Sequence, residues 1–580
     1  MLEVAELIER FGPSFCVLPW IHLDINMTGV CKACCMTLPL RDIGSEVLSV
    51  YESSLDDVWN SDSIRAMRRA MVFGEEVPDC LATCIVREKS GGLSRRLMEN
   101  RRWENEHVER KGVSIADLKT EAIKNNFRIH SLPVDLTLEA DNLCNLACRM
   151  CNPGTSSRVE HDSVHKNYEK RTISFPTWRN NSLDVLPLML YRVTYYGFRE
   201  YNDSVKDKVV WIAGAAEIRI ALINEYIECL AIRLSSQSLS REIHVCVNGE
   251  LVYSTANGQA NPRDILVKLG RHYEDLYLNF DCCDTSVNSS SDELVGFGLE
   301  RVTVKRSVDK LPGTEMLYSR FPGKRHWIQE DDFVFGELLT DNVQLQRVTF
   351  SGGEPLINPN VLRLIHLLSK SNSSKQITLC LATNGTVYNT EVFDLAKDFR
   401  LLCLSVSVDA IGPVNEYIRH GTKMQEVESN LHKMALTKNV FLMISSTINA
   451  YNVLEFSNVL RFCDCHGLVN YANFITNPDY LSMNVLPPSV RKIASQRLNE
   501  YAATDDGILA NKKSAIAHAQ RLDLQGLQFD PSKLQKFMIF TNDLDRSRKQ
   551  CVRKTLPELV QLLESAGYPW ADETKYWGAI

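Results

Sequence analysis

Six segments of the chain have the pattern of apolar positions expected for core β-strands. In the first of them Val134, Leu136 and Leu138 alternate with polar neighbours, the pattern of a half-buried strand. Several strands are followed by a segment of helical period, such as 453–463. Alternating strands and helices predict a parallel sheet with ligands at the carboxyl ends of its strands. The predicted strands lie at 132–140, 348–350, 377–387, 402–411, 440–453 and 468–477.

A second β-rich region interrupts this alternation between the first and second strands. Short alternating runs follow one another from about 190 to 305. Asn248-Gly249, between two apolar runs, is a strong hairpin signal. Strands at such short spacing predict an inserted antiparallel β-sandwich.

The two ends of the chain have other patterns. A helical stretch at 55–72 lies among the cysteines of the N-terminal region, and from about 481 the chain becomes helical and polar. These changes predict an α/β protein with five segments. They are an N-terminal domain at 1–130, a barrel-like core in two parts at 131–185 and 309–480, a β-sandwich at 186–308, and a helical C-terminal region at 481–580.

Composition narrows the functional class. The chain has 580 residues and a net charge of −7, so no basic field favours nucleic acid. No apolar run approaches the roughly 20 residues of a membrane span, and the first residues do not resemble a secretory signal. We therefore expect a cytoplasmic protein without a membrane or nucleic-acid partner. Its 18 cysteines then favour metal ligation over disulfides.

Three cysteines directly after the first strand form a C-x3-C-x2-C pattern. They are Cys144, Cys148 and Cys151 in the run CNLACRMC. Iron–sulfur clusters are normally held by four thiolates, so a group of three suggests a cluster with one iron open to another ligand. A zinc corner would be the alternative for the pattern taken alone.

The second strand runs into Ser-Gly-Gly-Glu-Pro. Gly352 and Gly353 allow the backbone to approach a ligand closely, and Pro355 stops the strand. With the cysteine pattern, this sequence resembles the radical S-adenosylmethionine (SAM) superfamily. The resemblance implies a partial (β/α)6 TIM-like barrel. It also implies a [4Fe–4S] cluster on Cys144, Cys148 and Cys151, with SAM bound to the open iron.

The resemblance also implies contacts to SAM at the strand ends. The double glycine and its glutamate would meet the methionyl amine, while residues after the third and fourth strands would meet the ribose and carboxylate. Asp409 as a helix cap and Arg419 as a surface charge are the alternatives. The expected contacts are Gly352, Gly353, Glu354, Asn384, Ser407, Asp409 and Arg419.

A second group of cysteines lies in the first hundred residues. Its order resembles the SPASM/twitch type of auxiliary cluster domain: a cysteine, a hairpin carrying G-x4-C, a helix and a closing pair. The resemblance implies one auxiliary [4Fe–4S] cluster, as in the shorter twitch form. Such domains commonly follow the barrel, whereas this one precedes it. The implied ligands are Cys16, Cys34, Cys80 and Cys84.

Two questions about this group stay open in the sequence. The spacing from Gly29 favours Cys34 as the second ligand, with Cys31 and Cys35 as alternatives. A zinc site made of four cysteines would have similar spacing. Iron and zinc content would separate the two metals.

These features together predict a radical SAM enzyme, an iron–sulfur oxidoreductase or peptide-modifying type, that abstracts hydrogen from a peptide or protein side chain. A sugar or sugar nucleotide is the alternative substrate, because the β-module faintly resembles jelly-roll modules of carbohydrate-active proteins. The module could equally be a spacer or docking unit. A degenerate barrel serving as a scaffold is a different class. The predicted radical SAM enzyme would also need an electron donor of the flavodoxin or ferredoxin type.

Overall fold

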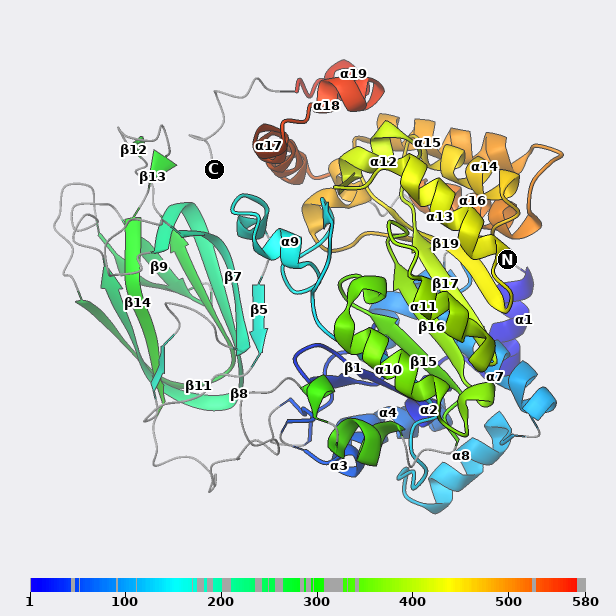
Figure 1. The fold of residues 1–580 in the computed structure, drawn as a ribbon. Helices are drawn as coiled ribbons and strands as arrows, with labels where there is room; N and C mark the ends of the chain where they lie inside the picture. The colour runs from blue at the N-terminus through cyan, green and yellow to red at the C-terminus, as the bar shows by residue number, and fades with distance from the viewer. Residues whose placement is uncertain are drawn as a thin grey trace.

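The computed structural model describes 2–168 and 327–570 almost continuously, and of the region between them mainly the strands. Figure 1 shows a barrel-like α/β body with a separate β-module beside it. Short gaps lie at 43–46, 52, 90–91, 111, 331, 340–343 and 524–527.

All six predicted core strands are present, and each pairs in parallel with the next in chain order. The predicted parallel sheet is thereby confirmed. The strands are β3 (Asp135–Glu139), β15 (Arg347–Ser351), β16 (Thr378–Thr383), β17 (Leu401–Ser407), β19 (Val440–Ile448) and β20 (Asn470–Phe474).

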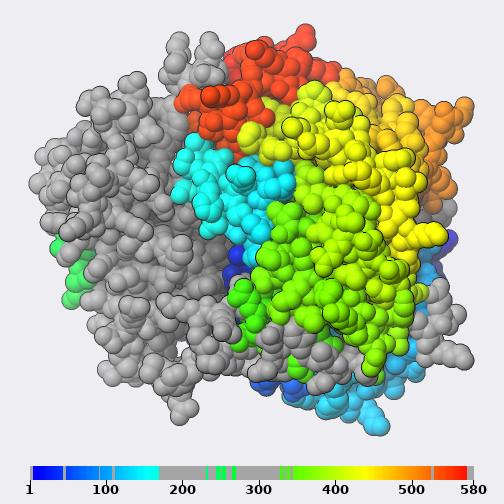
Figure 2. Space-filling model, viewed as in Figure 1, coloured from blue at the N-terminus to red at the C-terminus, as the bar shows by residue number. Residues whose placement is uncertain are grey.

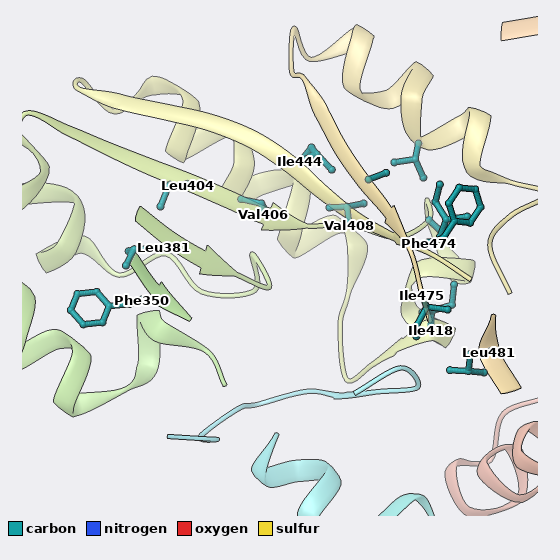
Figure 3. Close-up of a cluster of buried hydrophobic side chains, with 14 of the residues drawn as sticks. Phe350, Leu381, Leu404, Val406, Val408, Ile418, Ile444, Phe474, Ile475 and Leu481 are labelled. Atoms are coloured by element: carbon teal, nitrogen blue, oxygen red, sulfur yellow. The ribbon is translucent and has the colours of Figure 1, made fainter. Parts of the chain in front are cut away.

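One face of this sheet is apolar and packs into the main core. Phe350, Leu381 and Leu404 form a row across three neighbouring strands and are buried (Figure 3). On the opposite face, Cys380 and Cys403 are only half-buried. The chain between the strands forms α10 (Pro359–Ser369), α11 (Thr390–Leu395), α12 (Pro413–Ile418), α13 (Met424–Leu436) and α14 (Phe456–Cys465).

The N-terminal region is joined to this sheet rather than standing apart. Strand β1 (His22–Ile25) pairs in parallel with β3, and β2 (Cys31–Lys32) pairs antiparallel with β1. The sheet thus has eight strands, in the order β2-β1-β3-β15-β16-β17-β19-β20. The sequence indicated the turn at Gly29, which has a φ of +75°, but not that β1 would pair with β3.

The N-terminal region also touches the other edge of the sheet. Arg87, on α6 (Val86–Lys89), lies 5.6 Å from the centre of the Tyr471 ring on β20 and donates a hydrogen bond to Asn473. The region is thus fixed to both the first and the last strand of the core.

The helix predicted at 55–72 is broken into α3 (Leu55–Trp59) and α4 (Asp62–Phe73). The break has a clear cause in Asn60, whose side chain bonds both the N–H and the carbonyl of Ile129. Arg68 donates a hydrogen bond to the carbonyl of Trp59, which would otherwise accept one from the next turn of a continuous helix. A tertiary contact therefore overrides the local helical pattern.

Helix α7 (Arg95–Arg110) lies against the amino-terminal ends of the core strands. Arg347 of β15 makes ion pairs with Asp135 of β3 and with Glu99 of α7. Arg102 of α7 also pairs with Asp135. The sequence did not single out this helix or α8 (Ile115–Lys124).

The C-terminal region is helical where the structure describes it. It contains α15 (Pro488–Ala502), α16 (Leu509–Leu522), α17 (Pro531–Arg548) and α19 (Pro557–Ser565). In Figure 2 the cyan segment after β3 lies between the green barrel and the red C-terminal helices. In the part of the chain that the structure describes, no helix is both long and apolar enough to cross a bilayer.

Most described strand pairs of the inserted module are antiparallel, as predicted, but β14 (Phe297–Arg306) pairs in parallel with β8 (Val210–Leu234). Strands β9 (His244–Val247) and β10 (Glu250–Ser254) form the predicted hairpin, with Asn248 at a φ of +49°. The long strands β8 (Val210–Leu234) and β11 (Asp264–Asp281) pair antiparallel. The hairpin is confirmed, while the two-sheet sandwich stays a prediction because much of 186–308 lies outside the described residues.

Candidate cluster and S-adenosylmethionine site

The cysteine loop is held at the carboxyl edge of the sheet. It leaves β3, and its short strand β4 (Ala147–Cys148) pairs with β18 (Arg419–His420), so that Cys148 lies opposite Arg419. The N–H of Cys151 donates to the carbonyl of Cys148, which closes the turn between the last two cysteines. The three predicted cluster ligands therefore share one tight loop at the strand ends.

The double glycine lies directly against this loop. Gly353 has a φ of +55°, and a Cβ atom on it would stand 2.3 Å from the carbonyl oxygen of Leu143. The N–H of Glu354 donates to the same carbonyl at 2.8 Å. The two motifs, some two hundred residues apart in sequence, thus meet directly.

Alanine at Gly353 should therefore be more damaging than alanine at Gly74, the left-handed residue that ends α4. Both glycines have positive φ values, but a Cβ at Gly74 would meet nothing within 4 Å. Gly74→Ala should lower the free energy of unfolding by about 1–2 kcal/mol, the cost of the left-handed conformation alone. Gly353→Ala must also displace Leu143, so we expect a larger loss and less iron after reconstitution. Equal losses would mean that the close approach is unimportant.

Glu354 connects the end of β15 to the end of β16. Its buried carboxylate accepts hydrogen bonds from the Thr383 hydroxyl at 2.7 Å, from the N–H of Asn384 at 2.6 Å and from the N–H of Leu356 at 3.1 Å. Burial raises the pKa of Glu354, and these donors oppose the rise. In this structure the Glu354 carboxylate accepts hydrogen bonds from groups of the protein itself, so its expected contact with the methionyl amine of SAM stays a prediction.

Asn384 connects the third strand end to the first cysteine. Its amide nitrogen donates to the side-chain oxygen of Asn145 at 2.8 Å and points at the Cys144 sulfur, 4.0 Å away. Its own oxygen accepts from the N–H and hydroxyl of Thr386. The residue predicted for SAM thus lies beside a predicted cluster ligand.

Asp409 and Arg419 form a buried ion pair beside Cys148. The Arg419 Nε donates to an Asp409 oxygen at 2.6 Å, while its Nη1 lies 3.9 Å from the Cys148 sulfur. The other Asp409 oxygen accepts from the N–H of Thr447. Arg419 is only 9% exposed and Gly412 is the N-cap of α12, so the surface-charge and helix-cap alternatives are both wrong. Ser407 is half-buried at the end of β17.

The surroundings of the three sulfurs suit an iron–sulfur cluster. Cys144 accepts from the N–H of Leu146, and Cys151 is 3.1 Å from the Thr155 hydroxyl. Burial raises the pKa of Cys148 to about 12, and the Arg419 charge opposes that rise. Donors and positive charge around sulfur stabilise bound thiolates and tune a cluster's potential. Over the described residues, no three His, Cys, Asp or Glu side chains are grouped as ligands of one metal ion.

The auxiliary cysteines also converge. Burial raises the pKa of Cys16 well above its usual value, and the charges of Cys34, Cys80 and Cys84 raise it further. The pKa of Cys80 is raised to about 12, first by burial and then by Cys84 and Cys34. The four residues that the resemblance implied are thus near enough for their charges to interact, and their ligation of one cluster stays a prediction.

The two alternative cysteines have other partners. Cys31 is fully buried and its thiol donates to the carbonyl of Gly29, 3.6 Å away. Cys35 is exposed and contacts the Arg95 guanidinium. Cys34 is therefore the member of this trio that faces Cys16 and the closing pair.

Two acidic residues that sequence reasoning missed lie beside the double glycine at the end of β15. Asp24 of β1 is 3% exposed, and Glu139 ends the neighbouring strand β3. A Cβ on Gly352 would stand 3.3 Å from the Cβ of Glu139. Burial, with the Asp24 charge as the second cause, raises the pKa of Glu139 to about 7. Their signal in sequence is only an acidic residue on the polar face of each strand.

Glu139→Gln should stabilise the protein at alkaline pH. Folding raises the pKa of this carboxyl from 4.5 to about 7, so the folded chain binds the proton more tightly than the unfolded chain. Glu139 therefore lowers the free energy of unfolding as pH rises through that window, by roughly 1–3 kcal/mol. In thermal unfolding, the midpoint temperature of Glu139→Gln should be higher than that of the parent at pH 8 and equal to it below pH 5. As a control, Glu121→Gln on α8 should leave the midpoint temperature unchanged at both pH values. If Glu139→Gln raised the midpoint equally at pH 8 and below pH 5, the raised pKa of Glu139 would be contradicted.

The fold and the cysteine groups define an iron–sulfur protein with a parallel α/β core. Residues 327–445 match the radical SAM superfamily, and residues 16–85 match the iron-sulfur cluster-binding domain SPASM. The chain therefore contains a radical SAM domain, whose cofactors are a [4Fe–4S] cluster and SAM, and a SPASM domain for an auxiliary cluster. The second match runs from Cys16 to one residue beyond Cys84, whereas the loop of Cys144 lies outside both.

Solved structures give partial alignments. One, described as native anSMEcpe with bound AdoMet, is 18% identical and covers 27% of this chain and 44% of that chain, with a TM-score of 0.22. The chain thus spans less than half of that protein's length. A family 35 carbohydrate binding module from Clostridium thermocellum is 12% identical and covers 19% of this chain and 90% of that one, with a TM-score of 0.14. Such partial alignments carry no argument here. No curated protein matches the chain.

Proposed function

We propose that this enzyme cleaves SAM reductively and uses the resulting deoxyadenosyl radical to abstract hydrogen from a peptide or protein side chain. The carrying observation is the direct contact between the loop of Cys144, Cys148 and Cys151 and the double glycine at the end of β15. That contact supports the proposal, because the three predicted cluster ligands and a backbone able to approach a ligand closely then share one edge of the sheet.

The bound cofactors would supply the electron and the radical, and the chain's residues orient and shield them. Cys144, Cys148 and Cys151 would hold the first cluster. Arg419 places positive charge beside the sulfur of Cys148, and Asp409 fixes the guanidinium. Gly352 and Gly353 would offer backbone groups to the methionyl amine, with Ser407 and Asn384 at the neighbouring strand ends.

The auxiliary site supports a substrate that meets both centres. Strand β1 of the SPASM domain pairs directly with β3, whose end leads into the cysteine loop. A substrate bound beside Glu139 would thus lie close to the SAM-binding strand end and to the domain that carries Cys16, Cys34, Cys80 and Cys84. Enzymes resembling this arrangement often act on peptides, and the auxiliary cluster would then accept an electron or anchor the substrate.

Anaerobic reconstitution followed by SAM and dithionite tests the proposal. We expect deoxyadenosine, and we expect a mass change in a peptide or protein encoded beside this gene. Modification of a sugar nucleotide instead, together with glycan binding by the full chain, would favour the sugar alternative. If iron-loaded protein formed no deoxyadenosine, the result would favour the alternative of a degenerate barrel that acts as a scaffold. Zinc in place of iron at the four-cysteine group would replace the auxiliary cluster by a structural zinc site.

A further inference from the structure

Two cysteines outside both cluster sites lie side by side on neighbouring core strands. Cys380 of β16 and Cys403 of β17 are direct partners in the parallel register. Both are free and half-buried, and both lie on the face opposite the apolar core. Partners in adjacent strands have Cα atoms about 5 Å apart, which is within the range that a disulfide spans.

The surroundings of the pair make the two thiols unequal. The Cys380 thiol donates a hydrogen bond to the sulfur of Cys403, and this bond lowers the pKa of Cys403 while it raises that of Cys380. Arg347 and Arg400 also lower the pKa of Cys403, while burial and the Glu106 charge oppose them. Such an electropositive, partly exposed position is typical of a reactive thiol.

A cavity with several cationic residues in its lining lies near this pair, at the base of the barrel. It has a volume of about 430 Å³ and opens between α7 and the start of β17. It is lined in part by Arg101, Arg102, Glu106 and Arg400, so three of these four charged residues are cationic. The charges of Glu106 and Arg400 also act on the pKa of Cys403, and Arg400 lies three residues before Cys403 along the chain.

We propose that Cys380 and Cys403 form a redox-active dithiol that is oxidised to an intramolecular disulfide by a small anionic disulfide such as oxidised glutathione. Cys403 attacks one sulfur of the oxidant, forms a mixed disulfide and releases one glutathione thiol. Cys380 then attacks Cys403, forms the β16–β17 bridge and releases the second. Two protein S–H bonds break, one S–S bond forms, and the oxidant takes up two electrons and two protons.

The test uses the cluster-loaded full chain under anaerobic conditions. The protein is equilibrated in glutathione buffers of increasing oxidised fraction, acid-quenched, alkylated and digested, and disulfides are mapped by mass spectrometry. Cys465, a single exposed cysteine on α14, is the internal reference. We expect bridged Cys380–Cys403 peptides in buffers where Cys465 is still mostly alkylated.

Two variants separate the chemistry from a general effect on folding. In Cys380→Ser, Cys403 should accumulate as a stable glutathione adduct, forming about tenfold faster than the adduct on Cys465. In Cys403→Ser, Cys380 should stay unmodified. Both variants should keep parental iron content and SAM cleavage, because neither residue touches the cluster or SAM site. Absence of the bridge, or equal reactivity of Cys403 and Cys465, would overturn the proposal.

Discussion

Cys148→Ala should abolish deoxyadenosine formation, leaving only the background of cluster-free protein. Cys148 is the buried member of the C-x3-C-x2-C group and lies opposite Arg419 in the short ladder at the strand ends. A two-thiolate remnant would leave a second iron without a protein ligand, and the positive charge of Arg419 would face a methyl group. We therefore expect loss of the SAM-binding cluster, measured by anaerobic iron analysis and by electron paramagnetic resonance of the reduced protein.

Cys80→Ala is the matched control. Cys80 belongs to the four-cysteine group with Cys16, Cys34 and Cys84, on the SPASM domain. This variant should keep deoxyadenosine formation within about threefold of the parent, an order-of-magnitude allowance for altered packing, while product formation from substrate stops. Normal SAM cleavage by Cys148→Ala, or its complete loss in Cys80→Ala, would contradict the division of labour between the two cysteine groups.

The core could be predicted from sequence because local patterns determine it. The strand around Leu136 and the run ending in Gly352-Gly353 each carry their period and their stop signal within a few residues. The hairpin at Asn248 is likewise a local signal. The same holds for the cysteine groups, whose spacing along the chain reflects the loop that each one forms.

The contacts that assemble the site were not predictable in this way. The pairing of β1 with β3 joins His22 to Asp135, more than a hundred residues away, and a four-residue strand carries no mark of its partner. The carboxyl pair of Asp24 and Glu139 follows from that pairing alone. The break at Asn60 likewise depends on Ile129. In each case a tertiary partner, absent from the local pattern, decides the outcome.

The C-terminal region gains a role from one such contact. Arg149, between the second and third cysteines of the cluster loop, is fully buried and pairs with Asp545 of α17. Its guanidinium lies 3.7 Å from the centre of the Tyr417 ring. Tyr417 donates its hydroxyl to the same Asp545 oxygen at 2.7 Å, and the N–H of Val552 donates to the other at 2.6 Å. Helix α17 thus contacts the cluster loop directly through Asp545.

Asp545→Ala should therefore cost about 3–5 kcal/mol of unfolding free energy, because it leaves the Arg149 charge buried without its counterion. The loop would lose an anchor one residue from Cys148, so iron occupancy and the resonance spectrum of the SAM-binding cluster should change while those of the auxiliary cluster do not. Glu558→Ala is the control, since its ion pair with Arg497 is 31–42% exposed and such pairs contribute about 1 kcal/mol or less. Denaturant unfolding of both variants and of the parent measures the free energy of unfolding that each substitution costs. If Asp545→Ala lost no more stability than Glu558→Ala and kept the parental spectrum, α17 would be a cover for the barrel rather than a support for its cluster loop.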